Sequence, residues 1–323
     1  MKKNYVIIVI LLSFALAGCR TTIPSASVSA FYFDTSISIT IYDANCEELL
    51  QQCLDQCEEM EKIFSRTRSD SELYALNHRT SNCITISDAL YTVIEKGLIA
   101  YEISEHHFDI TTGLLLELWN FNGADPHIPK DSDIQEALRH TGSDKISLHK
   151  NQIIFYDNQL QLDLGALAKG YIADELAHYL QSKKVTNALI NLGGNIITIG
   201  TKPDGSKWKI GIQKPFGAQG ESITTIESEN QSIVSSGIYE RCFSENNIFY
   251  HHLLDAKTGY PMNNELYQVT ILSSSSLDGD MLSSVVYLLG KEKGMAYIES
   301  LNNVEALLID SKQQCYETKG WPQ

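Results

Sequence analysis

The stretch 163–174 constrains the fold most, because its sequence, Asp-Leu-Gly-Ala-Leu-Ala-Lys-Gly-Tyr-Ile-Ala-Asp, predicts a strand that turns into a helix. Short apolar runs before it, at 153–155 and 160–164, predict extended chain. After it, apolar residues recur at helical spacing. Asp163 therefore ends a strand, and Gly165-Ala166 open a helix. A chain that joins strand to helix in this way is typical of a mixed fold.

The predicted helix start is a candidate anion site. A strand that turns through glycine into a helix leaves free backbone N–H groups, and these groups and the helix dipole favour a phosphate. Asp163 caps this helix or helps to hold a cation, and Lys169 reaches toward the phosphate. The alternative is an ordinary capped amphipathic helix that binds nothing. The stretch alone does not decide between the two.

Length and composition set wider bounds. The 323 residues suffice for one large domain or two ordinary ones, and 43% hydrophobic with 20% charged residues is typical of a globular protein. The formal net charge is −15, or −17 once residues 1–18 with their two lysines are removed. Such a surface repels nucleic-acid phosphates, so we expect no nucleic-acid partner. A phosphate ligand would need a metal ion or a local pocket to offset this field.

Residues 1–18 have the features of a bacterial signal peptide. Two lysines follow Met1, and the apolar run 5–17 is too short to span a membrane comfortably as a permanent helix. The run ends in Leu16-Ala17-Gly18-Cys19, which resembles the lipobox of lipoproteins. We therefore expect acylation of Cys19, with chains such as palmitate, and a lipid anchor in a bacterial membrane of the cell envelope, facing the periplasm or the exterior. An ordinary signal peptide with an incidental cysteine is the alternative.

Beyond the signal peptide, residues 19–30 are rich in Ser, Thr and Ala and predict a tether, so that the folded domain covers 31–323. Apolar periodicity predicts helices at 47–64, 72–77, 87–101, from 131, 278–289 and 291–301. It predicts strands at 31–42, 188–192, 195–199, 208–212, 233–241, 249–255, 267–272, 306–309 and 315–318. No solenoid repeat or Pro/Gly-rich linker divides the chain. The economical fold is one α+β domain, mixed and two-lobed.

Six cysteines remain if Cys19 carries a lipid. An even number in an exported protein permits disulfides but does not establish them. Cys53 and Cys57 lie one helical turn apart on an apolar face, and no histidine or further cysteine lies at metal-site spacing. We expect both to pack in the core.

Two pairs of polar residues are candidates for chemistry. Asp280 and Ser284 lie at i and i+4 near a helix start, where a carboxylate and a hydroxyl on one face suit Mg²⁺; a helix-start aspartate with a solvated serine is the alternative. His251 and His252 are adjacent on a strand and point to opposite faces, so only one of them enters a site. The sequence has no P-loop, no Gly-x-Ser-x-Gly elbow and no His-Glu-x-x-His motif.

With these pieces in place, the chain resembles the ApbE family of FAD:protein FMN transferases over nearly its whole mature length. Each block alone is weak, but six in the same order are specific. The blocks are Phe108-Asp-Ile-Thr with Leu118-Trp119; the stretch 163–174; Asn191-Leu-Gly-Gly-Asn195; Ser236-Gly-Ile-Tyr-Glu-Arg241; His251-His-Leu-Leu-Asp-Ala-Lys-Thr-Gly-Tyr-Pro261; and Asp280-Met-Leu-Ser-Ser284. The resemblance implies the ApbE fold, which is T-fold-like.

The resemblance also implies a reaction and a set of site residues. FAD binds with its diphosphate beside Mg²⁺, and its FMN half passes to a Thr or Ser hydroxyl of a target protein, releasing AMP. The implied metal ligands are the Ala166 carbonyl, the Asp280 carboxylate and the Ser284 hydroxyl. The implied contacts to FAD are Phe33, Thr111, Thr112, Gly113, Asp163, Lys169, His252 and Leu254. Either Asp163 or His252 takes the proton from the incoming hydroxyl.

Several positions depart from the family pattern. Ser284 stands where Thr is usual, which preserves the hydroxyl, and Ala256 and Leu114 replace common prolines. Phe33-Asp34-Thr35 stands where Met-Gly-Thr is frequent, which weakens the case for a flavin contact there. None of these changes removes a chemical group that the mechanism needs.

Two other functions are compatible with the same residues. In a Mg²⁺-dependent FAD pyrophosphatase, water replaces the acceptor hydroxyl, and FMN and AMP are released. A lipoprotein that only binds flavin would release neither. For a transferase, the family implies a partner: a flavoprotein subunit of an exported or membrane-bound redox complex with the motif Asp-Gly-x-Ser/Thr-Gly-Ala/Ser-Thr. The lipid bilayer, through Cys19, is the other expected partner.

Overall fold

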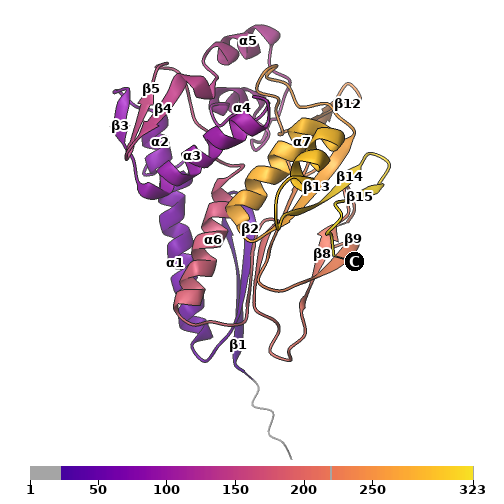
Figure 1. Ribbon diagram of the computed structural model, residues 1–323. Coiled ribbons are helices and arrows are strands. Elements are labelled where there is room, and N and C mark those ends of the chain that lie inside the picture. Colours follow the sequence, from indigo (N-terminus) through magenta and orange to yellow (C-terminus); the bar gives the residue numbers. More distant parts are fainter. Residues whose placement is uncertain (1–22, 219, 323) are drawn as a thin grey trace, which may run out of the picture.

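Eight antiparallel strands form the central sheet (Figure 1). The computed structural model describes residues 23–218 and 220–322. In order across the sheet, the strands are β1 (Ser25–Tyr32), β2 (Thr35–Tyr42), β6 (Ala188–Leu192), β7 (Asn195–Ile199), β10 (Ser232–Gly237), β13 (Leu266–Ser273), β14 (Glu305–Asp310) and β15 (Cys315–Glu317). The glycines of the tight β6–β7 hairpin, Gly193 and Gly194, have φ of 59° and 97°. The hairpin predicted at this glycine pair is confirmed.

Three helices cover one face of this sheet: α1 (Cys46–Phe64), α6 (Ala168–Ser182) and α7 (Ser276–Glu299) (Figure 1). The sequence of β2 explains the burial, because every second residue, Ile37, Ile39 and Ile41, faces the helices and is at most 1% exposed. The hairpin of β8 (Trp208–Gln213) and β9 (Ser222–Ser228) packs on the other face through a second, smaller core. The strands between them are therefore apolar on both faces.

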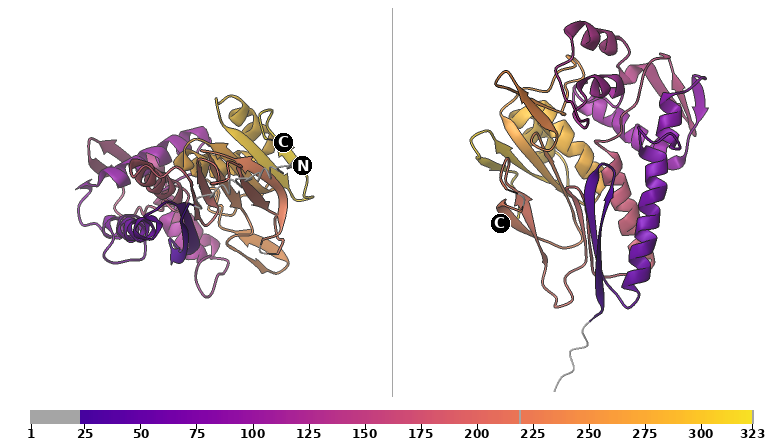
Figure 2. Two further views of the ribbon diagram at one scale, coloured as in Figure 1. Left: turned by 90° about the horizontal axis from the view of Figure 1, so that it is seen from below. Right: turned by 180° about the vertical axis from the view of Figure 1, so that it is seen from behind.

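The upper lobe carries the remaining elements (Figures 1 and 2). They are α2 (Glu72–Asn77), α3 (Asp88–Ile103), α4 (Gly113–Trp119), α5 (Asp131–Arg139), a short 3-10 helix (Ser143–Lys145), the sheet of β3 (Cys83–Thr85), β5 (Gln152–Phe155) and β4 (Ile146–His149), and the hairpin of β11 (Cys242–Glu245) and β12 (Ile248–His251). The Trp119 ring joins distant segments, because it contacts Phe243 and Tyr250 of the hairpin and its Nε1–H donates to the Gly259 carbonyl at 2.9 Å.

Most of the predicted helices are confirmed. Ser87 caps α3 by accepting a hydrogen bond from the Leu90 amide at 3.2 Å. The two helices predicted around residue 290 form α7, which Gly290 breaks with a φ of 77°. Cys53 and Cys57 are fully buried in the core, as predicted. All six cysteines in the described part of the chain are free thiols. No helix among residues 23–218 and 220–322 is long and apolar enough to cross a membrane.

The prediction for the N-terminal part of the domain was wrong in two respects. The strand predicted over 31–42 is a hairpin, β1–β2, which turns at Phe33 and Asp34, both with a φ of 56°. No glycine marks this turn. The predicted tether, 19–30, overlaps β1 from Ser25 onward, because its alternation of serine with Ala and Val is the pattern of a half-exposed edge strand. The signal peptide and Cys19 lie outside the described residues.

The segment before α6 also differs from the prediction. The leucines of 160–164 are buried, but this segment forms only an isolated bridge to Thr112 and no strand. The backbone of Gln161 and Asp163 pairs with the segment 110–113, whereas Asn77 pairs with both the N–H and the carbonyl of Leu162. Helix α6 begins at Ala168, not at Gly165, after a turn. The strand predicted over 233–241 ends at Gly237, the one over 249–255 ends at His251, and β9 was not predicted.

Candidate active site

The stretch 163–174 holds α6 against the start of α7. Gly170 lies at the contact, where a Cβ atom would come within 2.3 Å of the Ser276 carbonyl oxygen. Asp174, at the end of the stretch, accepts hydrogen bonds from Ser275 Oγ at 2.8 Å and from the amides of Ser276 at 2.7 Å and Leu277 at 3.0 Å. A carboxylate at the first amides of a helix is favourable. Sequence analysis missed this role, which joins residues about a hundred positions apart.

This packing places Asp280 beside the first turn of α6. Asp280 is 3% exposed, and its Oδ2 accepts the Gly170 amide hydrogen at 2.9 Å. In a regular helix that amide would pair with the Ala166 carbonyl. Within the described residues the Ala166 carbonyl accepts no hydrogen bond, so it is open to a ligand. Burial raises the pKa of the Asp280 carboxyl, and the nearby charge of Lys169 opposes that shift.

The three predicted metal ligands fit a hard cation such as Mg²⁺. Ser284 follows Asp280 by one turn of α7, is 3% exposed, and its hydroxyl forms no hydrogen bond in the part of the chain that the structure describes. Asn195 of β7 lies beside Asp280, and its side-chain amide favours the charged form of that carboxylate. A carboxylate, a carbonyl and a hydroxyl are the oxygen donors that Mg²⁺ accepts, with phosphate oxygens or water filling other positions. No group of three His, Cys, Asp or Glu side chains among the described residues offers a rival metal site.

Lys169 reaches this point, as its place in the helix predicts. Its Nζ lies 3.3 Å from the Gly165 carbonyl and 3.9 Å from Asp280 Oδ1. The Lys169 charge also acts on Glu240, whose pKa is raised by desolvation, and on His252. The start of α6 and the segment 240–252 therefore meet at Lys169. The structure brings together the cation, the buried carboxylate and the histidine that the sequence singled out.

Asp163 caps the turn before α6 and not the helix itself, which corrects the prediction. Its Oδ1 accepts the Gly165 amide at 2.9 Å, and its Oδ2 pairs with Arg66 Nη1 at 3.1 Å. Arg66 Nη2 also donates to the Gly113 carbonyl at 3.1 Å. Arg66 thus fixes Asp163 against the segment 109–113. Arg66 is not among the predicted site residues, because no local pattern relates it to a partner 97 residues away.

At the predicted flavin contacts Thr111, Thr112 and Gly113, both threonine hydroxyls already form hydrogen bonds within the protein. The Thr111 hydroxyl is fully buried, donates to Asp109 Oδ1 at 2.7 Å and accepts the Gly142 amide at 2.7 Å. The Thr112 hydroxyl donates to the Asp109 carbonyl at 3.0 Å. Gly113 packs on the Gln161 backbone, whose oxygen would lie 2.8 Å from an added Cβ. A ligand would meet backbone groups here.

The two adjacent histidines have different surroundings, although only His251 lies on strand β12, where both were predicted. His251 is buried, and its Nε2 lies 3.1 Å from the Met262 carbonyl and 3.3 Å from the Tyr287 hydroxyl. His252 follows the last residue of β12, with Nδ1 3.3 Å from the Arg241 carbonyl. Since a carbonyl only accepts, Nδ1 carries the hydrogen and Nε2 has a free lone pair. Desolvation, followed by the charge of Arg241, lowers the pKa of His252 to about 3.

Phe33 and Leu254 are placed less favourably for ligand contact. Phe33 forms the β1–β2 turn, where its amide donates to Glu61 Oε1 at 2.7 Å. The Leu254 side chain is 7% exposed and packs with Trp119 and Leu115, so only its backbone can face a ligand. Two surface cavities, one at Asp174 and one at His107, are lined by none of the predicted FAD or metal contacts.

The sequence matches the ApbE family over residues 33–308. The FAD:protein FMN transferase of Klebsiella pneumoniae (strain 342) is 33% identical over 286 residues, which cover 88% of each chain. This chain belongs to the ApbE family. The resemblance seen in the six sequence blocks is therefore confirmed. A second relative, the FAD:protein FMN transferase of Vibrio cholerae, is 31% identical over 301 residues, covering 91% of this chain and 90% of its own.

Solved structures of ApbE proteins share the fold. The flavin transferase ApbE from Vibrio cholerae superposes with a TM-score of 0.82 at 29% identity, covering 92% of this chain and 98% of its own. The ApbE protein of Thermotoga maritima gives a TM-score of 0.84 at 27% identity, covering 92% and 97%. The predicted ApbE-type α+β domain is thus confirmed. The roles of individual site residues remain predictions. The structure adds the positions and contacts of these residues.

Proposed function

We propose that this ApbE-family protein transfers the FMN moiety of FAD to a Thr or Ser hydroxyl of a target flavoprotein and releases AMP. Relatives that align with about nine-tenths of the chain bear the name FAD:protein FMN transferase. The observation that carries the proposal is the pairing of Asp280 with the Gly170 amide, which leaves the Ala166 carbonyl open beside Lys169. The Lys169 charge suits a negatively charged ligand, and the Asp280 carboxylate with the open Ala166 carbonyl suits a metal cation.

The proposed reaction is a phosphoryl transfer. The acceptor oxygen forms a bond to the phosphorus of the FMN half, the bond from that phosphorus to the oxygen of the AMP half breaks, and the hydroxyl loses its proton. Such reactions depend on charge neutralisation and alignment more than on covalent chemistry. Lys169 is placed to bind phosphate oxygens. Asp280, Ser284 and the Ala166 carbonyl would hold Mg²⁺, which supplies further positive charge at the diphosphate.

His252 is the better candidate for the proton acceptor. Both oxygens of Asp163 already accept hydrogen bonds, one of them from Arg66. His252 is neutral at neutral pH because its pKa is about 3, and its Nε2 lone pair is directed away from the Arg241 carbonyl. A neutral imidazole can accept the hydrogen of an incoming hydroxyl. Asp163 is then a positioning group held by Arg66.

The proposal extends to partners and location. The Leu-Ala-Gly-Cys sequence at 16–19 supports lipidation of Cys19 and a site in the cell envelope, facing the periplasm or the exterior. The acceptor would then be an exported or membrane-bound flavoprotein subunit with the motif Asp-Gly-x-Ser/Thr-Gly-Ala/Ser-Thr. Mg²⁺ is the expected metal.

Mass spectrometry of the products tests the proposal. An apo acceptor subunit with this motif is incubated with the protein, FAD and MgCl₂, with and without EDTA. A covalent FMN adduct together with AMP, both abolished by EDTA, is the expected result. Free FMN and AMP without an adduct would identify a pyrophosphatase. FAD that binds but stays intact would identify a flavin-binding protein, and either outcome would overturn the proposed transfer.

A further inference from the structure

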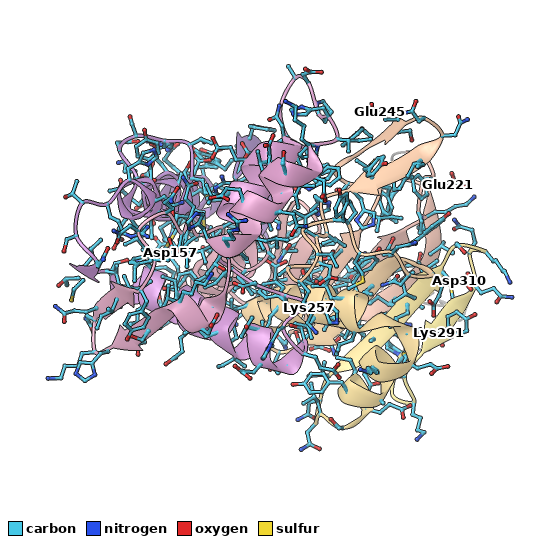
Figure 3. All side chains as sticks on the ribbon, turned by 90° about the horizontal axis from the view of Figure 1, so that it is seen from above. Asp157, Glu221, Glu245, Lys257, Lys291 and Asp310 are labelled. Carbon is cyan, nitrogen blue, oxygen red and sulfur yellow. The ribbon has the colours of Figure 1, made fainter. Side chains whose placement is uncertain are left out.

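An exposed aromatic patch joins the tips of two hairpins. It consists of Phe216 and Phe249 with Ile248, which are 50%, 36% and 54% exposed. The Phe216 ring stands edge-on to Phe249 at 5.5 Å and to Tyr267 of β13 at 5.1 Å between ring centroids. Figure 3 shows the two hairpins on one flank, with Glu221 of β8–β9 and Glu245 of β11–β12 labelled. Aromatic rings gathered at the surface are typical of protein interfaces.

The backbone at Phe216 is strained, which points to a role for its ring. The Gly217 amide donates to the Lys214 carbonyl at 3.0 Å, so Pro215 and Phe216 are the central residues of a turn. Phe216 has a φ of 57°, at a turn position that favours glycine. A bulky residue in this conformation costs on the order of 1 kcal/mol, and such strain is concentrated at functional sites. Gly217 follows immediately, yet the phenylalanine takes the strained position.

The aromatic patch is continuous with the candidate active site. Phe249 lies on β12 only three residues before His252, and the β11–β12 hairpin begins directly after Arg241. Tyr239 lies beneath Phe216 at 5.7 Å between centroids, and its hydroxyl donates to the buried Gln268 at 2.6 Å. Tyr239 in turn precedes Glu240 and Arg241. The charge of Arg241 acts on both Glu240 and His252. The same short segments carry the aromatic patch and the site.

We infer that the aromatic patch of Phe216, Ile248 and Phe249 binds the acceptor protein and directs its hydroxyl to the site. This inference rests on the proposed function, which requires a macromolecular substrate to cover the region around His252. The matching surface is an apolar one beside the acceptor hydroxyl, because the patch itself carries no charge. A bilayer is a poorer occupant, because β1, the strand nearest in sequence to the proposed lipid site at Cys19, begins at the end of the sheet opposite β12 (Figure 1).

Three variants test the inference. Phe216→Gly removes the ring and relieves the strained turn, so its melting temperature should not fall. Phe249→Ser removes the second ring. The control, Tyr156→Ser, changes an aromatic side chain that is 66% exposed in the upper lobe, away from both hairpins. The assay measures KM for an apo acceptor subunit, KM for FAD, and the rate of AMP release without acceptor.

We expect Phe216→Gly and Phe249→Ser each to raise KM for the acceptor about tenfold, as for an interface residue of central importance. KM for FAD and acceptor-independent AMP release should stay within about twofold of wild type, and the control should match wild type throughout. If wild type forms no adduct, the proposed function and the inference fail together. An unchanged acceptor KM beside normal wild-type transfer overturns the inference alone.

Two further measurements test the alternative occupants of the aromatic patch, a membrane and a second copy of this chain. If the wild type sediments with vesicles of phosphatidylethanolamine and phosphatidylglycerol and Phe216→Gly does not, the patch is a membrane contact. If light scattering shows a wild-type dimer that Phe249→Ser dissociates, the occupant is a second copy of this chain. Either result, with an unchanged acceptor KM, overturns the inference. A parallel rise in KM for FAD would instead assign the rings to the flavin site and overturn it too.

Discussion

Single residues at this site connect segments that are far apart in the sequence. Arg66 is one example, because its two Nη atoms bind Asp163 on one side and the Gly113 carbonyl on the other. Its Nε is buried without a partner among the described residues, so the two Nη atoms make the hydrogen bonds of this guanidinium. Arg66 thus holds both the predicted flavin segment 111–113 and the start of α6 in place.

Replacing Arg66 should therefore loosen the FAD site more than the fold. We expect Arg66→Ala to lower kcat/KM for FAD at least about tenfold, because two segments of the site lose their alignment. Unfolding free energy should fall by about 1–2 kcal/mol, since the pair is only partly exposed. The control is Arg139→Ala, a solvated arginine paired with Glu136. Equal FAD kinetics in both variants would remove Arg66 from the site.

Asp280 is the residue on which the metal assignment depends. Asp280→Asn keeps the size of the side chain and an oxygen for the Gly170 amide, but removes the charge. We expect FMN transfer to fall about a hundredfold or more. The rise in melting temperature that MgCl₂ and FAD give the wild type should also disappear. The control is Asp278→Asn, which lies on the same helix as Asp280 and breaks a partly exposed pair with Lys96 of α3. Undiminished Mg²⁺-dependent transfer in Asp280→Asn would show that the metal lies elsewhere.

At the scale of elements, the site depends on contacts between segments that are distant in sequence. The local signals served well: Ser87 predicts the start of α3 by its capping, and Gly290 marks the break in α7. The pairing of Asp174 with the start of α7, and of Arg66 with Asp163, has no periodicity that a sequence can reveal. The β1–β2 turn was missed because Phe33 and Asp34 adopt positive φ without a glycine. The six family blocks predict the site residues, and the structure shows which contacts hold those residues in place.

The packing of β12 against α7 should make stability depend on pH. Burial lowers the pKa of His251 from 6.5 to about 4. The unfolded chain therefore binds a proton between these pH values that the folded chain does not, so stability is complete above pH 6.5 and falls toward pH 4. At pH 5 this one group would cost about 2 kcal/mol of unfolding free energy.

Urea unfolding at pH 7.5 and pH 5.0 measures this loss. We expect His251→Gln to be less stable than wild type at pH 7.5, because the contacts with Met262 and Tyr287 change. Its further loss at pH 5.0 should be smaller than that of wild type by about 2 kcal/mol. His252 remains in both proteins, so its own titration cancels in the comparison. Equal losses would mean that His251 is not held neutral by burial.

At the scale of the whole molecule, the proposed site and the proposed membrane anchor involve opposite ends of the sheet. The upper lobe and the starts of α6 and α7 carry the candidate site, whereas β1 begins at the opposite end (Figure 1). Ser25, the first residue of β1, follows Cys19 by six positions, so a lipid on Cys19 would lie at most about 20 Å from the strand. A lipid there would hold the foot of the sheet close to the bilayer and leave the site on the far side, facing acceptor proteins that project from the membrane.

This arrangement predicts that loss of the lipid anchor leaves the kinetics of FMN transfer in solution unchanged. Full-length wild-type protein, expressed in a bacterial host that processes lipoproteins, should enter the detergent phase in a Triton X-114 partition. Cys19→Ser should move to the aqueous phase or remain an unprocessed precursor. Purified Cys19→Ser should transfer FMN to a soluble acceptor with kcat and KM within about twofold of wild type, because no described residue at the foot of β1 pairs with Lys169, Asp280 or His252. Wild type that partitions into the aqueous phase would contradict the lipid anchor. A Cys19→Ser protein with impaired solution kinetics would contradict the separation of the two ends, since the anchor would then influence the site directly.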